Sequence, residues 1–306
     1  ALKREGSLFF LGTGVSTGIP SLQHILQKRD CLCQGATVGS RNRRNNVSIL
    51  LSVPDGDGVV RRVMVDAGKT MRDSLLAHLP RLGVETIDDV LLTHDHADAV
   101  GGVDDLRDLQ RMLEIRDEAG NLQGYRPENA LRVSASAKTL EVLRGQFGYL
   151  FAKPPASGQF LRRVATIDWQ VLEERGEITL HGLKIRTFPV FHGGDYISLG
   201  FIFGEHVVYI SDVKAVPEAS MELLQTTPIR ILIVDALSRD PHTTHFCLAD
   251  SIAFIEQVSP DRAFLVGMSC SMGDHDTVCE ELARLKETKN IDVQLAFDGQ
   301  QLPLPL

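Results

Sequence analysis

The chain has 306 residues, of which 43% are hydrophobic and 24% are charged, and this composition is typical of a globular protein with a large core. Its formal net charge of −8 excludes an overall basic field that would draw the protein to nucleic acid or to an anionic membrane. No stretch reaches the uninterrupted apolar length that a membrane span needs, so we expect no contact with a membrane.

The first half of the chain predicts strands that are followed by helices. Short runs rich in branched and aromatic residues, bounded by Gly, Pro and Asp, predict strands over 8–11, 47–53 and 59–65. Leucines at helical spacing predict a helix over 71–82, and the apolar run 90–92 predicts a short strand that leads straight into a polar loop. A strand over 131–133 and a helix over 137–147 follow.

The second half repeats this order. Strands are predicted over 178–188, 199–210, 229–234 and 263–266, and helices over 248–256 and 276–286. We find no internal repeat and no long flexible linker, so a single domain over 1–306 is the simpler expectation. Two groups of strands, each followed by helices, predict two sheets between helical layers.

The loop after residue 92 carries the strongest chemical signal. His94, His96 and Asp98 follow one another at every second position, and imidazole and carboxylate are the ligands of zinc, iron or manganese in hydrolytic sites. A merely polar surface loop is the alternative. Three companions favour the metal site, because each is a polar residue just after or at the end of an apolar strand, where open sheets place their sites: Asp66, His192 and Asp212.

Together these residues resemble the metallo-β-lactamase superfamily. Within it the chain is most similar to the branch of the phosphoribosyl cyclic phosphodiesterase, and ribonuclease Z is a more distant relative. The resemblance spans nearly the whole chain and includes five further segments: Leu11–Pro20, Arg41–Arg44, Gly102–Arg107, Pro241–His245 and Phe297–Gly299. It implies an α/β (α+β) fold, a four-layer αββα sandwich with the metal site at one edge of the two sheets.

The resemblance also implies how a metal would be held. Residues matching His94, His96 and His192 bind the first metal in that superfamily, and the residue matching Asp212 bridges to a second. The expected cofactor is zinc or manganese, with at least one ion per chain. Asp98 would orient the attacking water or bind a second ion, and Asp66 would hold a ligand histidine by a hydrogen bond.

Two departures from the superfamily pattern affect the second metal. Ala99 and Gly267 stand where the relatives carry histidines, and neither offers a donor atom. Three outcomes are open: a single metal, a weak second metal on carboxylates and water, or a replacement ligand from Asp95, Asp104 or His275. Because the remaining carboxylates are hard ligands, they suit manganese or magnesium better than zinc. We expect one firmly held metal and a second site that is empty, weak or differently built.

The cysteines predict a reducing environment. Their number, five, is odd, and this favours reduced thiols or metal ligands over a disulfide framework. The phosphodiesterase relatives can carry a structural zinc on a Cys-x-Cys-x-x-Cys segment and a distant histidine. Here Cys31 and Cys33 are kept, the third position is Ala36, and Cys270 lies near the place of the distant ligand. A three-thiolate site with an unidentified fourth ligand competes with metal-free, partly buried cysteines.

The remaining histidines and cysteines carry no functional signal of their own. Cys247 and Cys279 fall in or beside predicted helices and are expected to be core residues. Four histidines are expected to be solvent-exposed or simply hydrogen-bonded, without convergent partners: His24, His78, His181 and His206.

Residues outside the metal motif are candidates for binding a substrate phosphate. In the relatives, a histidine matching His245 holds the phosphate or assists the leaving group, and His242 would support it. The alternative is a loop that only caps the following helix. Arg41, Arg43 and Arg44 could present forked donors to a phosphate, or could form a solvated surface.

The resemblance predicts a metal-dependent hydrolase, specifically a phosphodiesterase in which metal-bound hydroxide attacks a small cyclic phosphodiester or nucleotide-like substrate. The sequence shows no extended basic stripe or base-stacking array for a polynucleotide. Two alternatives stay open: a thioester or lactone hydrolase with the same chemistry, and a non-catalytic binding protein with a degenerate metal site. We further expect a cytoplasmic location, with organelle import left open, and consider a homodimer.

Overall fold

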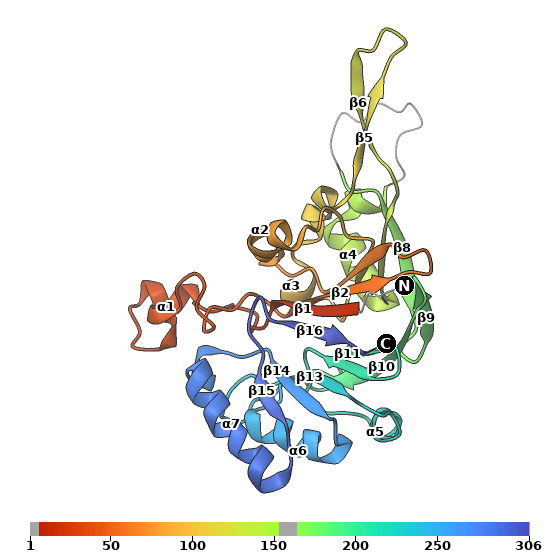
Figure 1. Cartoon of the computed structure of the whole chain (residues 1–306). Coiled ribbons are helices and arrows are strands. Elements are labelled where there is room, and N and C mark those ends of the chain that lie inside the picture. The colour runs from red at the N-terminus through yellow and green to blue at the C-terminus, as the bar shows by residue number, and fades with distance from the viewer. Residues whose placement is uncertain (1–5, 153–163, 306) are drawn as a thin grey trace.

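The computed structural model describes residues 6–152 and 164–305. Two seven-stranded sheets face each other, and helices cover the outer face of each sheet (Figure 1). This is the four-layer αββα sandwich that the sequence predicts, and the fold class is confirmed. None of the helices in the described ranges is both long and apolar enough to cross a membrane.

The first sheet is antiparallel at one side and parallel at the other. Its strand order is β16 (Gln301–Leu304), β1 (Gly6–Gly12), β2 (Ser48–Pro54), β3 (Val60–Val65), β4 (Asp89–Leu91), β7 (Leu131–Ser136) and β8 (Ile167–Leu172). The pairs from β3 to β8 run parallel, so the carboxyl ends of β3 and β4 meet at the same edge.

The second sheet has a similar division. Its order is β15 (Val293–Leu295), β14 (Arg262–Val266), β13 (Ile231–Asp235), β12 (Val207–Ile210), β11 (Ile197–Phe203), β10 (Leu183–Phe191) and β9 (Glu177–Leu180). The pairs from β12 to β15 run parallel, whereas β9 to β12 pair antiparallel. The carboxyl ends of β10, β12, β13 and β14 therefore share one edge.

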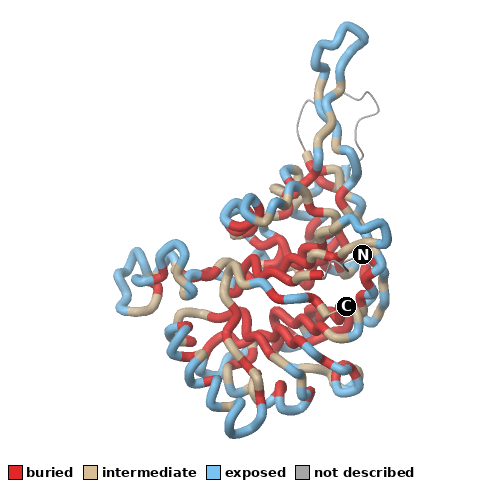
Figure 2. The backbone as a smooth tube through the Cα atoms, viewed as in Figure 1, coloured by how far each residue is buried: buried red, intermediate tan, exposed pale blue. Residues whose placement is uncertain are grey.

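Apolar side chains from both sheets fill the space between them. Phe10, Ile49 and Val65 of the first sheet and Phe201 and Ile233 of the second belong to one fully buried cluster. Burial of this apolar surface is the main term that holds the two sheets together. Figure 2 shows the buried chain concentrated in these layers.

Helices cover the outer face of each sheet and pack their apolar sides against it. The first sheet is covered by α2 (Met71–Leu82), α3 (Ala97–Val100) and α4 (Ala137–Gln146). The second is covered by α5 (Glu218–Gln225), α6 (Leu248–Val258) and α7 (His275–Lys289). The predicted helix over 71–82 has the bounds of α2, which ends where Gly83 takes a left-handed conformation with φ 63°.

Two predicted strands are each divided in the structure. The stretch 178–188 is a hairpin of β9 and β10, because His181 and Gly182 both take positive φ and turn the chain back. The stretch 199–210 is likewise divided between β11 and β12 by a turn at Gly204. A further hairpin, β5 (Met112–Arg116) and β6 (Leu122–Pro127), was not predicted and projects from the body at the top of Figure 1.

Candidate metal centre

Polar residues from both sheets meet at the shared edge. His94 and His96 follow β4, Asp66 follows β3, His192 follows β10, and Asp212 follows β12. Each strand is largely apolar and buried toward its carboxyl end, so its register fixes where the first polar residue beyond it emerges. The structure thus brings together the residues that the sequence predicts for a metal site.

Three imidazoles form the centre of this site. Ligand nitrogens of His94, His96 and His192 lie within 4.8 Å of one another. The Nδ1 of His192 donates to the carbonyl oxygen of Thr244 at 2.9 Å, and this leaves its Nε2 free to bind a cation. The Nε2 of His94 is buried and has no hydrogen-bond partner among the described residues. A buried nitrogen without a partner is costly unless it binds a metal, so this donor set fits a divalent ion.

The protonation state of the imidazoles also fits a bound metal ion. Burial lowers the pKa of His94 to about 4 and lowers the pKa of His192 as well. Both rings are therefore neutral near pH 7, which is the state that binds a metal.

Asp66 acts on this centre through Thr93. Its carboxylate accepts from the Thr93 amide at 2.8 Å and from the Thr93 hydroxyl at 2.9 Å. Because the Thr93 hydroxyl donates its proton in the hydrogen bond to Asp66, its oxygen can only accept a hydrogen bond from Nδ1 of His94, 2.8 Å away. Asp66 was expected to hold a ligand histidine directly, whereas here Thr93 relays the contact. The relay fixes the tautomer in which Nε2 of His94 is unprotonated.

Two carboxylates flank the imidazoles, and their pKa values are shifted in opposite directions. Burial would raise the pKa of Asp212, but His94, His192 and His245 outweigh it and hold the pKa below its usual value. An oxygen of Asp212 lies 4.0 Å from Nε2 of His192. Burial and the neighbouring Asp212 raise the pKa of Asp98. Asp212 is therefore the more acidic of the two, and the ionised carboxylate is the form that binds a cation.

His245 belongs to the same site and is held by Asp235, the last residue of β13. Its Nδ1 donates to Asp235 at 2.7 Å, and its ring lies 4.7 Å from that of His192. Burial would lower the pKa of His245, but the bond to Asp235 and the charges of Asp235 and Asp212 raise it to about 9. Asp235 was missed in the sequence, although it stands at a strand end like Asp66 and Asp212.

A family model described as a beta-lactamase superfamily domain matches residues 61–268, which include every residue of this site. The chain belongs to the metallo-β-lactamase superfamily. The predicted resemblance is thereby confirmed at the level of the superfamily.

Three known proteins show the range of this superfamily around the chain. An octanoyltransferase of Porphyromonas gingivalis is 27% identical over 260 residues, which are 85% of this chain but 45% of that protein. The chain thus spans less than half of that relative. The crystal structure of a diphosphatase from the PhnP family is 27% identical over 98% of both chains, with a TM-score of 0.74. Human tRNase Z, short form, at 16% identity over 98% of this chain and 100% of that one, shares the fold with a TM-score of 0.60.

The second metal position of the superfamily lacks both of its expected imidazole donors in this chain. Ala99 and Gly267 line a cavity of about 10 Å³ beside Asp98 and Asp212, which has room for about one water. A Cβ on Gly267 would come within 2.4 Å of Asp235 Oδ1, so Asp235 occupies the space that a side chain at 267 would need. A histidine at 267 would therefore require Asp235 to move.

None of the three suggested replacement ligands is among the described residues that line this cavity. Asp95 accepts a hydrogen bond from Tyr196, and Asp104 pairs with Arg107 and Tyr149. His275 begins α7, where its Nδ1 accepts from Arg44 at 3.1 Å. His245, by contrast, does line this cavity, and its ring forms a possible metal-binding group with His192 and Asp212.

The three arginines of the 41–44 segment have different surroundings. Arg44 is 3% exposed and donates to Thr13 at 2.7 Å and to the carbonyl of Ala296 at 2.6 Å. Its guanidinium is engaged inside the protein, so a phosphate contact is not expected from it. Arg41 is exposed and pairs with Asp276 at 2.9 Å, and Arg43 is exposed.

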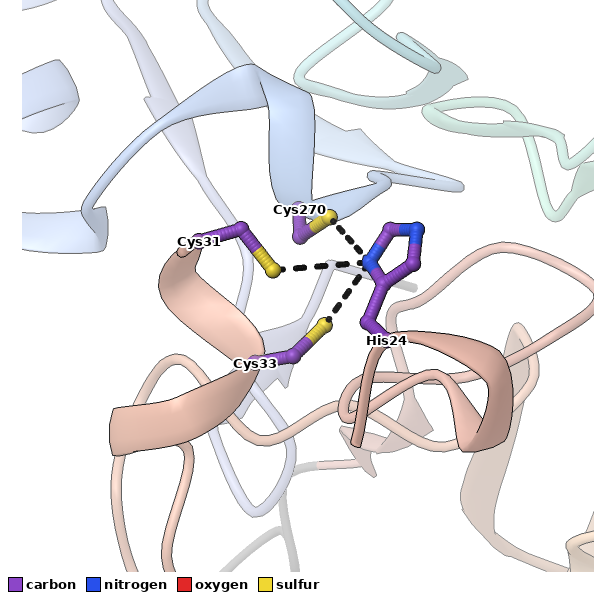
Figure 3. A group of neighbouring side chains, drawn as sticks. All are labelled: His24, Cys31, Cys33 and Cys270. Carbon is purple, nitrogen blue, oxygen red and sulfur yellow. Dashed lines mark hydrogen bonds between the residues drawn. The ribbon is translucent and has the colours of Figure 1, made fainter. Parts of the chain in front are cut away.

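A second cluster of metal-binding side chains lies away from the histidine centre. Its ligand atoms, from His24, Cys31, Cys33 and Cys270, all lie within 4.8 Å of one another (Figure 3). The Nδ1 of His24 is 3.4 Å, 3.5 Å and 3.3 Å from the three sulfurs in turn. Tetrahedral zinc with three thiolates and one imidazole requires nitrogen-to-sulfur distances of roughly 3.5 Å.

His24 thus stands where the sequence left the fourth ligand unidentified, and the expectation that it has no convergent partners was wrong. His24 lies in α1 (Leu22–Leu26). Cys31 directly precedes the 3₁₀ turn η1 (Leu32–Gly35), Cys33 lies within it, and Cys270 is the first residue of the 3₁₀ turn η4 (Cys270–Met272). The other three histidines of this group also have partners: His181 pairs with Asp89, His78 is buried against Phe9 and Arg81, and His206 bonds to the carbonyl of Pro228.

We predict that this cluster holds one structural zinc. Cys33→Ser should lower the zinc content by about one ion per chain and lower the melting temperature, because a closed zinc site contributes folding energy. Elemental analysis together with thermal unfolding measures both effects. Cys279→Ser, outside the cluster, is the matched control, and equal zinc in the two variants would refute the site.

Proposed function

We propose that the chain is a metal-dependent phosphodiester hydrolase that acts on a small substrate. The observation that carries the proposal is the His245–Asp235 pair, which lies beside three imidazoles arranged for a divalent ion. When bound, such an ion supplies Lewis-acid chemistry that activates water and stabilises charge on phosphoryl oxygens. The full-length likeness to a diphosphatase of the PhnP family supports a phosphorus substrate.

The side chains around the ion would divide the proton transfers between them. Asp98, with its raised pKa, is a better base for the attacking water than an exposed aspartate. His245 would donate its Nε2 proton to the departing oxygen as the P–O bond breaks. Because Nδ1 of His245 is bonded to Asp235, the carboxylate orients the ring and stabilises its protonated form.

A thioester hydrolase is the second candidate, and one observation favours it. The relative from Porphyromonas gingivalis is named as an octanoyltransferase. The matched part is 45% of that protein, so the name describes a longer chain than the matched region.

Parallel assays separate the candidates. Metal-free protein is titrated with zinc or manganese and offered bis(p-nitrophenyl) phosphate or an octanoyl thioester. We expect phosphodiester turnover that appears with the added metal. Turnover of the thioester alone would replace the proposal with the second candidate. No turnover of either substrate, without retained metal, would indicate a binding protein with a degenerate site.

A further inference from the structure

Tyr196 occupies a distinctive place at the metal centre, and nothing in the proposed reaction uses it. It closes the turn that follows His192: the His192 amide donates to the Tyr196 carbonyl at 2.8 Å, and the Tyr196 amide donates to the Gly193 carbonyl at 3.1 Å. Its position is thus fixed relative to one metal-binding imidazole by the backbone alone.

The ring of Tyr196 contacts all three imidazoles. It stacks on His96 with ring centres 4.7 Å apart and planes 19° apart. It meets His94 and His192 edge-on, at 6.1 Å and 5.9 Å. His96 is exposed whereas the other two imidazoles are buried, so His96 is the ring with least support from the core. Stacking on Tyr196 supplies that support.

The hydroxyl of Tyr196 forms hydrogen bonds with the loop that carries the other two imidazoles, His94 and His96. It donates to the carboxylate of Asp95 and accepts from the Asp95 amide at 3.3 Å. Asp95 lies between His94 and His96 in the chain, so these bonds join the loop after β4 to the loop after β10. The two loops belong to different sheets, and Tyr196 therefore connects the sheets at the metal centre.

Lys138, in the first turn of α4, completes the arrangement. Its ammonium lies 3.9 Å from the centre of the Tyr196 ring, a favourable cation–π contact. Lys138 and Ile197 also line an open cavity of about 640 Å³ between α4 and the turn from β8 to β9. Tyr196 is thus held from the side of this cavity as well as from the metal side.

From these contacts we infer that Tyr196 is a positioning residue for the metal centre. It holds His96 by stacking and holds the loop of His94 and His96 by its hydroxyl, so that three nitrogens from two sheets converge before an ion arrives. Lys138 holds the ring in turn. The inference rests on the proposed metal site but not on the identity of the substrate.

The test compares Tyr196→Phe, which keeps the stack and removes the hydroxyl, with Tyr196→Ala, which removes both. Tyr149→Phe is the matched control, since this tyrosine also donates to a carboxylate, that of Asp104, at 2.6 Å. The readouts are the Kd for cobalt(II) by chelator competition, the visible spectrum of the cobalt bound by histidines, and the melting temperature of the metal-free protein.

We expect the Kd to rise about 10–100-fold in Tyr196→Ala and by less in Tyr196→Phe, the range seen when groups that orient metal ligands are removed. The cobalt spectrum should change in both variants, while the metal-free melting temperature of Tyr196→Phe stays near that of the parent. An unchanged Kd and spectrum in Tyr196→Ala would overturn the inference, as would an equal rise in Tyr149→Phe. Because these readouts need no substrate, a failure of the phosphodiesterase proposal would not produce either result.

Discussion

His96→Ala is expected to lose the metal of the histidine centre and, with it, hydrolytic activity. Removing one of three imidazoles should weaken metal binding by more than the about 10–100-fold that loss of a supporting group gives. His96 is exposed, so the substitution removes little core packing and the fold should survive. Metal content after dialysis, circular dichroism and phosphodiester turnover measure the three effects.

The matched control for this variant is His206→Ala. His206 donates to the carbonyl of Pro228 at 3.0 Å, in the turn before β12, and lies among no metal-binding group of the described chain. It should leave both metal and turnover unchanged. Equal metal in His96→Ala and in the parent would show that the ligand assignment is wrong.

His245→Ala is expected to lower turnover of a phosphodiester about 10²–10⁴-fold while leaving the metal content unchanged, since general acid catalysis contributes about this much. Asp235→Asn should lower turnover in the same direction by less, because the ring keeps its proton donor but loses the carboxylate that orients it.

The leaving group gives this prediction a sharper form. A p-nitrophenolate leaves with little help, whereas a phenolate needs a proton, so the loss in His245→Ala should be larger for a phenyl ester than for a p-nitrophenyl ester. An equal loss for the two esters would argue against proton donation. Loss of metal would instead make His245 a ligand, as its place near His192 and Asp212 allows.

Much of this site could be predicted from the sequence because it follows one physical rule. Apolar strands are buried and their register is fixed, so polar residues directly after them must emerge together at the sheet edge. Asp66, His192 and Asp212 were found in this way. Asp235 obeys the same rule but was given no role, because its hydrogen bond to His245 is visible only in the folded chain.

The remainder depends on contacts between distant parts of the chain. His24 lies in the short helix α1, and its meeting with Cys270 depends on the packing of residues far apart in the chain, around Cys33 and the turn η4. Thr93 and Tyr196 act through hydroxyl groups whose partners only the folded chain defines. Arg44 belongs to a run of arginines, and only burial distinguishes it from Arg41 and Arg43.

Anomalous diffraction at the zinc edge, from crystals of zinc-loaded protein, tests the central claim most directly: that the three histidines hold a single ion. We predict one peak among His94, His96 and His192 and one among His24 and the three cysteines. No peak is expected in the cavity beside Ala99 and Gly267. A missing peak at the three histidines, or a further peak roughly 3.5–4 Å from it as in two-metal sites, would contradict the account.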